Sequence, residues 1–320
     1  MKIACLLYPT RDVKVNEDTS FWLLRALEKR GHEVSHFESS DLSSDGGRLS
    51  VRLTRSRLDP RRGYVDARRS RGCDLGSIDA VLVRKEPPFD SDYVHTLQLL
   101  SLAKERGLRV VNDPDAMLRY NEKTLLDLFP DLAPGMCWTR DVRHALDWVS
   151  GLKGGSVVIK PLDNRSGTGV VRARASDEAL PSLMMTLMDG GRRWVVLQRY
   201  LAGAAQGDKR VLLAGEEVVG VFRRVPAAGD FRSNLSVGGS MVRAGLTPAE
   251  TRLVQRVAPE LTRRGLWLTG LDVVDERLVE INITSPSGLP EIAQLYGRDR
   301  STWMAERLER YLLERGAGRG

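Results

Sequence analysis

The first 120 residues alternate short apolar runs with stretches of helical periodicity. Lys2–Tyr8 is an apolar run of strand length, and Thr19–Arg30 has apolar residues at helical spacing before Gly31, a typical helix stop. The same criteria predict further strands and one helix, over Glu33–Phe37, Ala80–Val83, Leu108–Val111 and Asp92–Arg106. This alternation predicts a parallel sheet with helices on both faces, a Rossmann-like domain of residues 1–120. The turn Pro9–Asp12 lacks the glycine fingerprint of dinucleotide-binding domains, which disfavours NAD binding.

From about Tyr120 the pattern changes to a mixture of helices and paired strands, typical of an α+β arrangement. Helices are predicted over Glu122–Phe129 and Val142–Leu152. Strand-like runs cover Ser156–Pro161, Trp194–Gln198, Arg210–Leu213, Glu217–Arg223, Gly270–Val274 and Leu278–Ile283. No internal repeat or low-complexity linker interrupts the chain, so we expect its domains to pack closely.

Composition indicates a soluble, globular protein of the cytoplasm. The 320 residues are 42% hydrophobic and 28% charged, which suffices for two or three domains that each bury a core. No run approaches the roughly 18 apolar residues of a membrane span, and the N-terminus enters a strand-like segment instead of a charged leader. Cys5, Cys73 and Cys137 show no disulfide-framework or metal-ligand spacing, which favours a reducing compartment.

Much of the excess positive charge, +7 overall, lies in the segment Arg48–Arg71, which has nine arginines. They alternate with Leu49, Val51 and Leu53, and this pattern predicts a strand with one wet face in a solvated hairpin. A nucleic-acid patch is the alternative, but Tyr64 is the only stacking ring in the segment and no nucleic-acid-binding motif accompanies it. We therefore expect neither a nucleic-acid nor a membrane partner.

Two segments have the residue types of a nucleotide site. The strand Val157–Pro161 contains Lys160 near its end, where an ammonium group can reach phosphates. Gly167 and Gly169 in the following turn would let backbone N–H groups approach a polyphosphate. The segment Gln198–Leu201 leaves a strand with free backbone groups that could bind an adenine edge. An ordinary hairpin turn and a plain strand exit are the alternatives.

Cationic residues gather at the ends of two later strands. Asp208 and Arg210 open one strand, Arg224 ends the next, and Arg232 follows in the glycine-containing stretch Pro226–Gly239. Clustered arginines can stabilise the charge that develops during phosphoryl transfer, and the stretch could form a lid that excludes water. A basic surface loop is the alternative.

The sharpest candidate is a metal site on the last two predicted strands. Alternation puts Glu280 and Asn282 on one face of a strand, and Asp272 lies across the hairpin from them. Two carboxylates and an amide, without His or Cys, suit Mg²⁺ (or Mn²⁺) that also binds substrate phosphates. Exposed strand polar residues are the alternative, which the apolar neighbours Val279 and Ile281 disfavour.

In this order the motifs resemble the ATP-grasp superfamily and, over nearly the whole chain, the bacterial glutathione synthetase family. The motifs that carry the resemblance are Val83–Asp90, Asn121–Lys123, Lys160–Pro161, Gly207–Val211, Arg232–Gly239, Gly270–Asp272 and Glu280–Pro286. The resemblance implies an ATP-grasp lid subdomain over residues 121–200 and a catalytic subdomain over 201–320. It also implies an ATP-dependent ligase that phosphorylates the carboxylate of γ-glutamylcysteine and joins it to the amine of glycine.

The resemblance further implies a role for each matching residue. Nucleotide contacts would come from Lys123, Lys160, Gly167, Gly169, Gln198, Tyr200, Leu201 and Asp208. Asp272, Glu280 and Asn282 would bind the metal, and Arg210, Arg224 and Arg232 would be catalytic. Substrate contacts would come from Ser20, Arg84, Lys85, Asn234, Gly238, Gly239, Ser285, Pro286 and Ser287. The implied partners are small-molecule or dipeptide substrates and further copies of the chain, in a dimer or tetramer.

The chain departs from the family pattern at two places. After Lys-Pro the family usually has Asp-Gly-x-Gly-Gly, whereas Asp163–Gly169 is bulkier here and bears an extra cation. Pro290 stands where the family often has Arg or Gln, so we expect relaxed selectivity toward amines slightly larger than glycine. A related ligase with another donor or amine is the alternative function. A non-catalytic binding protein is a third reading, which the intact metal-site motif disfavours.

Overall fold

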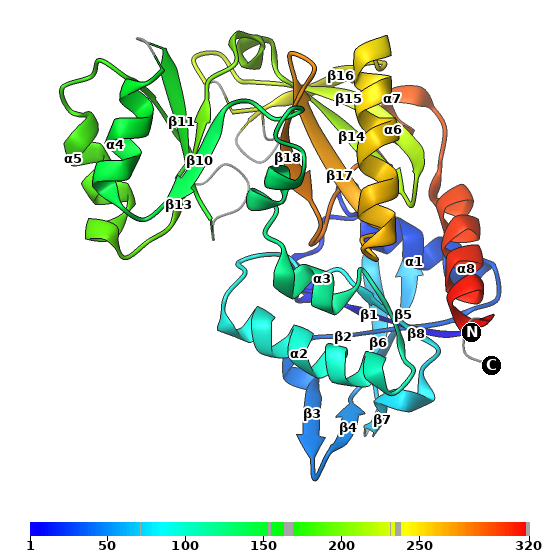
Figure 1. Ribbon diagram of the computed structural model, residues 1–320. Helices are drawn as coiled ribbons and strands as arrows, with labels where there is room; N and C mark the ends of the chain where they lie inside the picture. Colours follow the sequence, from blue (N-terminus) through cyan, green and yellow to red (C-terminus); the bar gives the residue numbers. More distant parts are fainter. Residues whose placement is uncertain (71, 153–154, 163–168, 231, 234–237, 318–320) are drawn as a thin grey trace.

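The computed structural model describes residues 1–320 except 71, 153–154, 163–168, 231, 234–237 and 318–320. Its N-terminal part contains a six-stranded sheet in the order β6-β5-β2-β1-β8-β9 (Figure 1). The strands are β1 (Lys2–Leu6), β2 (Glu33–Phe37), β5 (Thr54–Asp59), β6 (Gly63–Arg69), β8 (Ala80–Val83) and β9 (Arg109–Val111). The pairs among β2, β1, β8 and β9 are parallel, which confirms the prediction for these four strands. Antiparallel β5 and β6 extend the edge beside β2.

Alternation along β1 explains why helices cover both faces of this sheet. Ile3 and Cys5 belong to one buried cluster with residues of α1 (Thr19–Lys29) and α8 (Ser301–Ala317). Ala4 and Leu6 belong to a second cluster with residues of α2 (Ser91–Glu105) and α3 (Pro114–Arg119). The C-terminal helix α8 thus returns to the N-terminal sheet, where Arg30 and His32 contact Glu309 (Figure 1).

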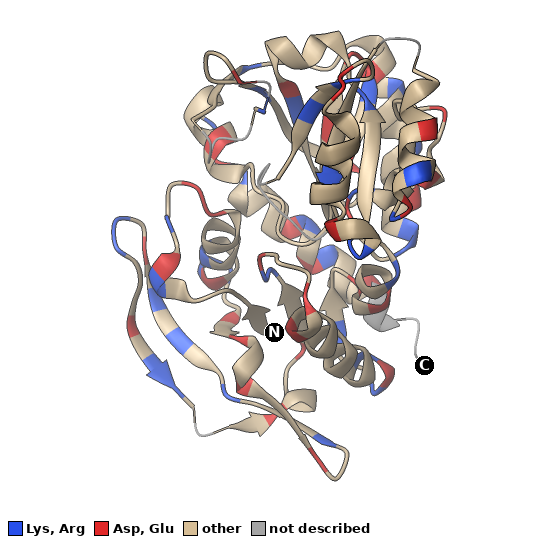
Figure 2. Ribbon diagram, turned by 90° about the vertical axis from the view of Figure 1, so that its left-hand side faces the viewer, with Lys and Arg blue, Asp and Glu red and all other residues tan. Residues whose placement is uncertain are grey.

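The arginine-rich segment is more elaborate than an isolated hairpin. Its first strand, β4 (Arg48–Val51), forms a separate sheet with β3 (Leu42–Asp45) and β7 (Cys73–Asp74), while β5 and β6 form the hairpin. Leu49 and Val51 are buried, and several arginines pair with carboxylates: Arg55 with Glu33, Arg57 with Asp66, and Arg52 and Arg69 with Asp41. Figure 2 shows Lys and Arg along these edge strands. The predicted alternation of buried and exposed residues is present in β4, and the predicted hairpin is formed by β5 and β6. The segment contributes strands to two different sheets.

The second part of the chain contains two further sheets. A four-stranded sheet, β10-β13-β11-β12, consists of β10 (Met136–Thr139), β11 (Ser156–Pro161), β12 (Val171–Arg174) and β13 (Val195–Arg199). Its apolar face packs against α4 (Val142–Ser150) and α5 (Leu180–Leu187) (Figure 1). An antiparallel five-stranded sheet, β16-β15-β14-β17-β18, consists of β14 (Asp208–Ala214), β15 (Glu217–Val225), β16 (Ser240–Arg243), β17 (Leu268–Val274) and β18 (Arg277–Asn282).

Side-chain alternation along β14 decides which residues face a cavity. Val211 and Leu213 are buried in one cluster with α6 (Pro248–Arg263), whereas Leu212 lies in the other cluster with α7 (Leu289–Tyr296). Arg210 shares the face of Leu212 and therefore points away from α6. Lys209 points toward α6, where its Nζ is 2.6 Å from Glu250 Oε2.

One predicted helix is wrong in type. The segment Glu122–Phe129 contains a 3₁₀ helix, η4 (Thr124–Leu128), whose Leu125 and Leu126 are buried. Other short 3₁₀ turns are η1 (Thr10–Asp12), η2 (Ser39–Asp41), η3 (Leu75–Ser77), η5 (Asp189–Gly191) and η6 (Ala202–Gln206). In the described part of the chain, no helix combines the length and apolar character needed to cross a membrane.

Candidate functional site

A cavity of about 830 Å³ is lined by residues from the ends of β1 and β8, from both later sheets and from the start of α7. Most of the residues predicted from sequence line it: Arg84, Lys85, Lys123, Lys160, Gln198, Tyr200, Leu201, Asp208, Arg210, Arg224, Arg232, Asp272, Glu280, Asn282, Ser285, Pro286 and Ser287. Positions far apart in the sequence therefore meet at one place.

The remaining predicted residues are elsewhere or outside the described chain. Gly169, Gly238 and Gly239 are described but are not among the residues that line the cavity. Ser20 lies behind the wall, where its Oγ accepts a hydrogen bond of 2.9 Å from Arg84 Nε. Gly167 and Asn234 lie outside the described residues, as does part of the predicted lid.

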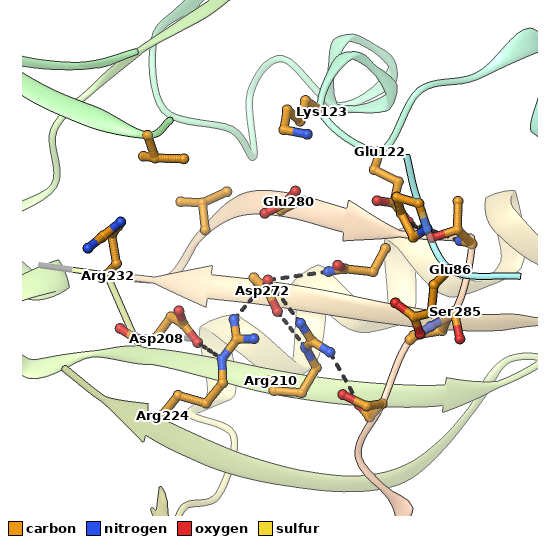
Figure 3. Close-up of a pocket in the computed structure, with 18 of the residues that line it drawn as sticks. Glu86, Glu122, Lys123, Asp208, Arg210, Arg224, Arg232, Asp272, Glu280 and Ser285 are labelled. Carbon is orange, nitrogen blue, oxygen red and sulfur yellow. Dashed lines mark hydrogen bonds and ion pairs between the residues drawn. The ribbon is translucent and has the colours of Figure 1, made fainter. Parts of the chain in front are cut away.

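Buried ion pairs organise the centre of the cavity around Asp272 (Figure 3). Arg210 Nε lies 2.6 Å from Asp272 Oδ1, and Arg224 Nη2 lies 2.9 Å from Asp272 Oδ2. Arg224 Nε also donates to Asp208 Oδ1 at 2.7 Å. Burial would raise the pKa of Asp272, but the two guanidinium groups outweigh it and hold that pKa below its usual range. Asp272 is therefore an ionised carboxylate that can only accept.

A glycine makes this arrangement possible. Gly207 has φ +100°, and a Cβ there would lie 1.9 Å from the carbonyl oxygen of Arg224. Because glycine lacks that atom, β14 approaches β15 closely and Asp208 pairs in register with Arg224. A side chain at position 207 would push the strands apart at the cavity.

The three predicted metal ligands come together on β17 and β18. Asp272 lies opposite Glu280 in the ladder, and Asn282 Nδ2 donates to Asp272 Oδ2 at 3.2 Å. Within the described residues, no three His, Cys, Asp or Glu side chains form a metal-binding group. Two carboxylates and one amide would thus hold Mg²⁺ only together with substrate or water oxygens, which is the usual way that proteins bind this ion. The residues present fit such a shared ion.

Lysines and an amide line the side of the cavity near β11 and β13. Lys123 Nζ donates to the carbonyl oxygen of Leu162 at 3.2 Å, and Lys160 Nζ donates to that of Val279 at 3.4 Å. Gln198 Nε2 donates to the same Val279 oxygen at 3.2 Å. Burial lowers the pKa of Lys160, and the nearby Glu280 carboxylate opposes that shift. Two cationic groups therefore face the carboxylates of β17 and β18, a polarity suited to a metal-bound polyphosphate.

Contacts from three directions fix the loop after β18. Glu122 Oε1 accepts from Ile283 N at 2.8 Å and from Thr284 N at 2.9 Å. Arg84 Nη2 donates to the carbonyl oxygen of Pro286 at 2.9 Å, and Arg210 Nη1 donates to that of Ser287 at 3.2 Å. This loop is therefore a firm wall of the cavity. Sequence reasoning gave Glu122 no role, although it lies in the motif Asn121–Lys123 that carried the resemblance.

The first turn of α7 contributes a residue that the sequence analysis also missed. Glu291 lines the cavity and is buried, and burial raises its pKa to about 7. A glutamate in the first turn of a helix is common because it interacts favourably with the helix dipole, so the sequence alone does not mark it. Pro290 is not among the described residues that line the cavity.

Comparisons with known proteins agree over nearly the whole chain. Residues 1–119 match the family model described as prokaryotic glutathione synthetase, N-terminal domain, and residues 122–297 match its ATP-grasp domain. Glutathione synthetase of Neisseria meningitidis serogroup B is 35% identical over 315 residues, covering 96% of this chain and 97% of that protein. The Vibrio parahaemolyticus protein of the same name is 31% identical over 313 residues, covering 97% of this chain and 98% of that protein.

Solved structures of ATP-grasp proteins have a similar fold. D-cycloserine synthetase DcsG has a TM-score of 0.68 at 16% identity, with 97% of this chain and 99% of that chain covered. The ATP-grasp ligase PsnB, solved with a minimal precursor, has a TM-score of 0.63 at 18% identity, with 97% and 98% covered. At these identities the likeness concerns the fold alone.

Proposed function

The chain belongs to the prokaryotic glutathione synthetase family, and we propose that it joins γ-glutamylcysteine to glycine while ATP is converted to ADP and phosphate. It is an ATP-dependent carboxylate-amine ligase of the ATP-grasp type. The observation that carries the substrate assignment is the full-length likeness to proteins named glutathione synthetase, together with one cavity that contains both a cationic and an acidic wall.

We assign the nucleotide to the side of the cavity formed by β11 and β13. Lys123 and Lys160 would bind the phosphates, and Gln198, Tyr200 and Leu201 would lie beside adenine. Support comes from the cavity lining, which includes all five side chains together with Asp272 and Glu280, and from the contacts of Lys160 and Gln198 with the carbonyl oxygen of Val279, next to Glu280. Asp272, Glu280 and Asn282 would hold Mg²⁺ (or Mn²⁺), which when bound neutralises phosphate charge.

The chemistry proposed for the site proceeds through an acyl-phosphate. An oxygen of the donor carboxylate bonds to the γ-phosphorus of ATP, and ADP leaves. The unprotonated amine of glycine then attacks the acyl carbon, its nitrogen releases one proton to solvent or to the departing phosphate, and phosphate leaves with the carboxylate oxygen. Arg210 and Arg224 would stabilise the negative charge of the transferring group. Both line the cavity, and their ion pairs with Asp272 hold the guanidinium groups in place. Arg232 lines the same cavity and would assist them.

Three larger-scale assignments accompany this function. Residues 1–120 would form the first domain and contribute Arg84 and Lys85 to the peptide site. Residues 121–200 would form the nucleotide-binding lid subdomain, and residues 201–320 would form the catalytic subdomain. The enzyme would act in the cytoplasm on small molecules or a dipeptide, without nucleic-acid or membrane partners, as a dimer or tetramer. Light scattering on the purified chain would give its oligomeric state.

A panel of donors and acceptors tests the proposed function. ADP release would be measured with γ-glutamylcysteine, related dipeptides and free amino acids as donors, each combined with glycine, alanine and β-alanine. The highest kcat/KM is expected for γ-glutamylcysteine with glycine, and Asp272→Asn should release no ADP in any combination. Turnover of another donor with none of γ-glutamylcysteine would replace the proposed function by the related-ligase alternative.

A further inference from the structure

The turn between β17 and β18 has an unusual backbone for the residues that form it. Asp275 and Glu276 alone separate the two paired strands, and their φ angles are 48° and 59°. Two-residue turns with positive φ at both positions usually contain Asn-Gly, because few side chains tolerate this conformation. Both residues are exposed, so burial in a core does not hold the turn in place.

The two side chains of this turn bind different elements. Asp275 Oδ2 accepts a hydrogen bond of 2.8 Å from Gly203 N in η6, 72 residues away in the sequence. Glu276 Oε1 accepts a hydrogen bond of 2.7 Å from Thr247 Oγ1, which belongs to the N-cap residue of α6. The turn is therefore held between η6 on one side and the start of α6 on the other.

Gly203 and Asp275 fit each other closely. The N–H groups of the first turn of a helix lack partners within it, and the residue before the helix usually supplies an acceptor side chain. That residue is Leu201 in η6, whose side chain has no acceptor. Asp275 supplies it instead, and a Cβ at position 203 would lie 1.9 Å from Asp275 Oδ1. Glycine is thus the residue that lets this carboxylate reach the backbone.

This hydrogen bond connects two parts of the cavity. Tyr200 and Leu201, proposed to lie beside adenine, come directly before η6, and Ala204 within η6 also lines the cavity. Asp275 directly follows β17, the strand that carries Asp272 (Figure 3). The segment assigned to adenine is therefore attached to the strand pair assigned to the metal.

We propose that Asp275 is a positioning residue for the nucleotide. It fixes the spacing between the segment beside adenine and the strands that hold the metal and phosphates, and it is not itself among the described residues that line the cavity. A nucleotide bound at both ends needs that spacing to be constant, since a shift of one part loses contacts at one end. This inference rests on the nucleotide placement in the proposed function and adds how its two ends are held in register.

Asp275→Gly removes the carboxylate without straining the turn. Glycine tolerates the φ of 48°, so the thermal unfolding temperature should not fall. The KM for ATP should rise about three- to tenfold, the range expected from loss of one hydrogen bond, with kcat within about twofold. The KM values for glycine and γ-glutamylcysteine should stay within about twofold of the wild type. Asp275→Asn keeps an acceptor and tolerates the same φ, so it should restore the KM for ATP.

Two further variants separate this contact from a general effect on the turn. Glu276→Gly alters the neighbouring residue of the same turn, with a similar φ, but removes the bond to Thr247 and should leave the KM for ATP unchanged. Gly203→Ala places a methyl group against the Asp275 carboxylate and should raise the KM for ATP. In the double variant with Asp275→Gly that methyl group has room, so the KM should be no higher than for Asp275→Gly alone.

Direct binding of ADP with Mg²⁺, measured by calorimetry, completes the test. The dissociation constant should rise in Asp275→Gly by the same factor as the KM for ATP and should be restored in Asp275→Asn. An unchanged KM for ATP in Asp275→Gly, an equal rise in Glu276→Gly, or an equal rise in the KM for glycine would overturn the inference. Because ADP binding needs no donor, failure of the wild type to use γ-glutamylcysteine would contradict the proposed substrate and leave this result standing.

Discussion

At the scale of single residues, the chemistry depends on which charges are already paired. Asp272, a proposed metal ligand, is held by Arg210 and Arg224, whereas Glu280 faces the cavity from the adjacent strand (Figure 3). The alternation of polar and apolar positions in β18 was enough to predict that Glu280 and Asn282 share a face. The pairing of Asp272 with two arginines from other strands could not be predicted, because it depends on tertiary contacts.

Replacement of Glu280 by glutamine should abolish turnover and leave the fold intact. Glutamine preserves the size of the side chain but removes the negative charge that a phosphate-bound Mg²⁺ requires. ADP release with Mg²⁺ or Mn²⁺ would be measured alongside thermal unfolding. ADP release close to that of the wild type would show that the metal site has been assigned to the wrong residue.

Pro290→Arg tests the predicted relaxation toward larger amines. An additional methyl or methylene group shifts selectivity in an apolar pocket by only about 1 to 3 kcal/mol, so alanine and β-alanine should be measurable acceptors for the wild type. The arginine variant should favour glycine more strongly, as kcat/KM ratios would show. Strict glycine preference in both proteins would reject the prediction. Such a result would fit the position of Pro290, which is not among the described residues that line the cavity.

At the scale of elements, strands were more predictable than helices. The runs predicted over Glu33–Phe37 and Ala80–Val83 coincide with β2 and β8. Helix α6 was missed although Thr247 and Glu250 form a capping box around Pro248, a signal present in the sequence. The segment after Glu122 has only a 3₁₀ helix, with Glu122 itself bonded to the backbone beyond β18. A local pattern does not contain such a long-range contact.

Asn112 links the end of β9 to the later sheet, so its removal should destabilise the protein. Its Nδ2 donates to the carbonyl oxygens of Leu268 and Ile283 at 2.8 Å, and its Oδ1 accepts from Leu268 N at 2.8 Å. Asn112→Ala would leave these buried backbone groups unpaired and should lower the free energy of unfolding by about 3 kcal/mol. Denaturant unfolding measures this, with the exposed Asn16→Ala as a control expected within about 0.5 kcal/mol of wild type. Equal effects of the two variants would contradict the proposed link.

At the scale of the whole molecule, the N-terminal sheet and the five-stranded sheet share their buried clusters. Val81 of β8 and Val211 of β14 lie in one cluster, and Cys5 of β1 and Leu212 of β14 lie in the other. The cavity is lined by residues from both parts of the chain, from Tyr8 and Arg84 after the N-terminal strands to Asp272 and Glu280 of the five-stranded sheet. The residues predicted from sequence form part of the cavity lining, and Glu291 in the first turn of α7 was not among them.

Acid should destabilise the whole fold partly through His36. This imidazole is buried between β2 and β5, contacts Ser56 Oγ at 2.9 Å, and burial lowers its pKa from 6.5 to about 4. Because the unfolded chain binds the proton more readily, its contribution to stability is complete above pH 6.5 and is lost as pH falls toward 4. Between about pH 7 and pH 5 the loss should reach about 2 kcal/mol.

Denaturant unfolding of the wild type and of His36→Gln over that pH range isolates this contribution. The variant lacks the titrating ring, so its stability should fall less steeply than that of the wild type between neutral and acidic pH. Parallel curves for the two proteins would show that His36 does not contribute to the acid sensitivity.

The central claim, ligation through an acyl-phosphate, is tested most directly by an oxygen label. γ-Glutamylcysteine with ¹⁸O in both oxygens of its reacting carboxylate would be incubated with ATP, Mg²⁺, glycine and the enzyme, and the products would be analysed by mass spectrometry. The mechanism predicts one ¹⁸O atom in each released phosphate, one in the new amide carbonyl, and ADP as the nucleotide product. Unlabelled phosphate, or AMP in place of ADP, would contradict it.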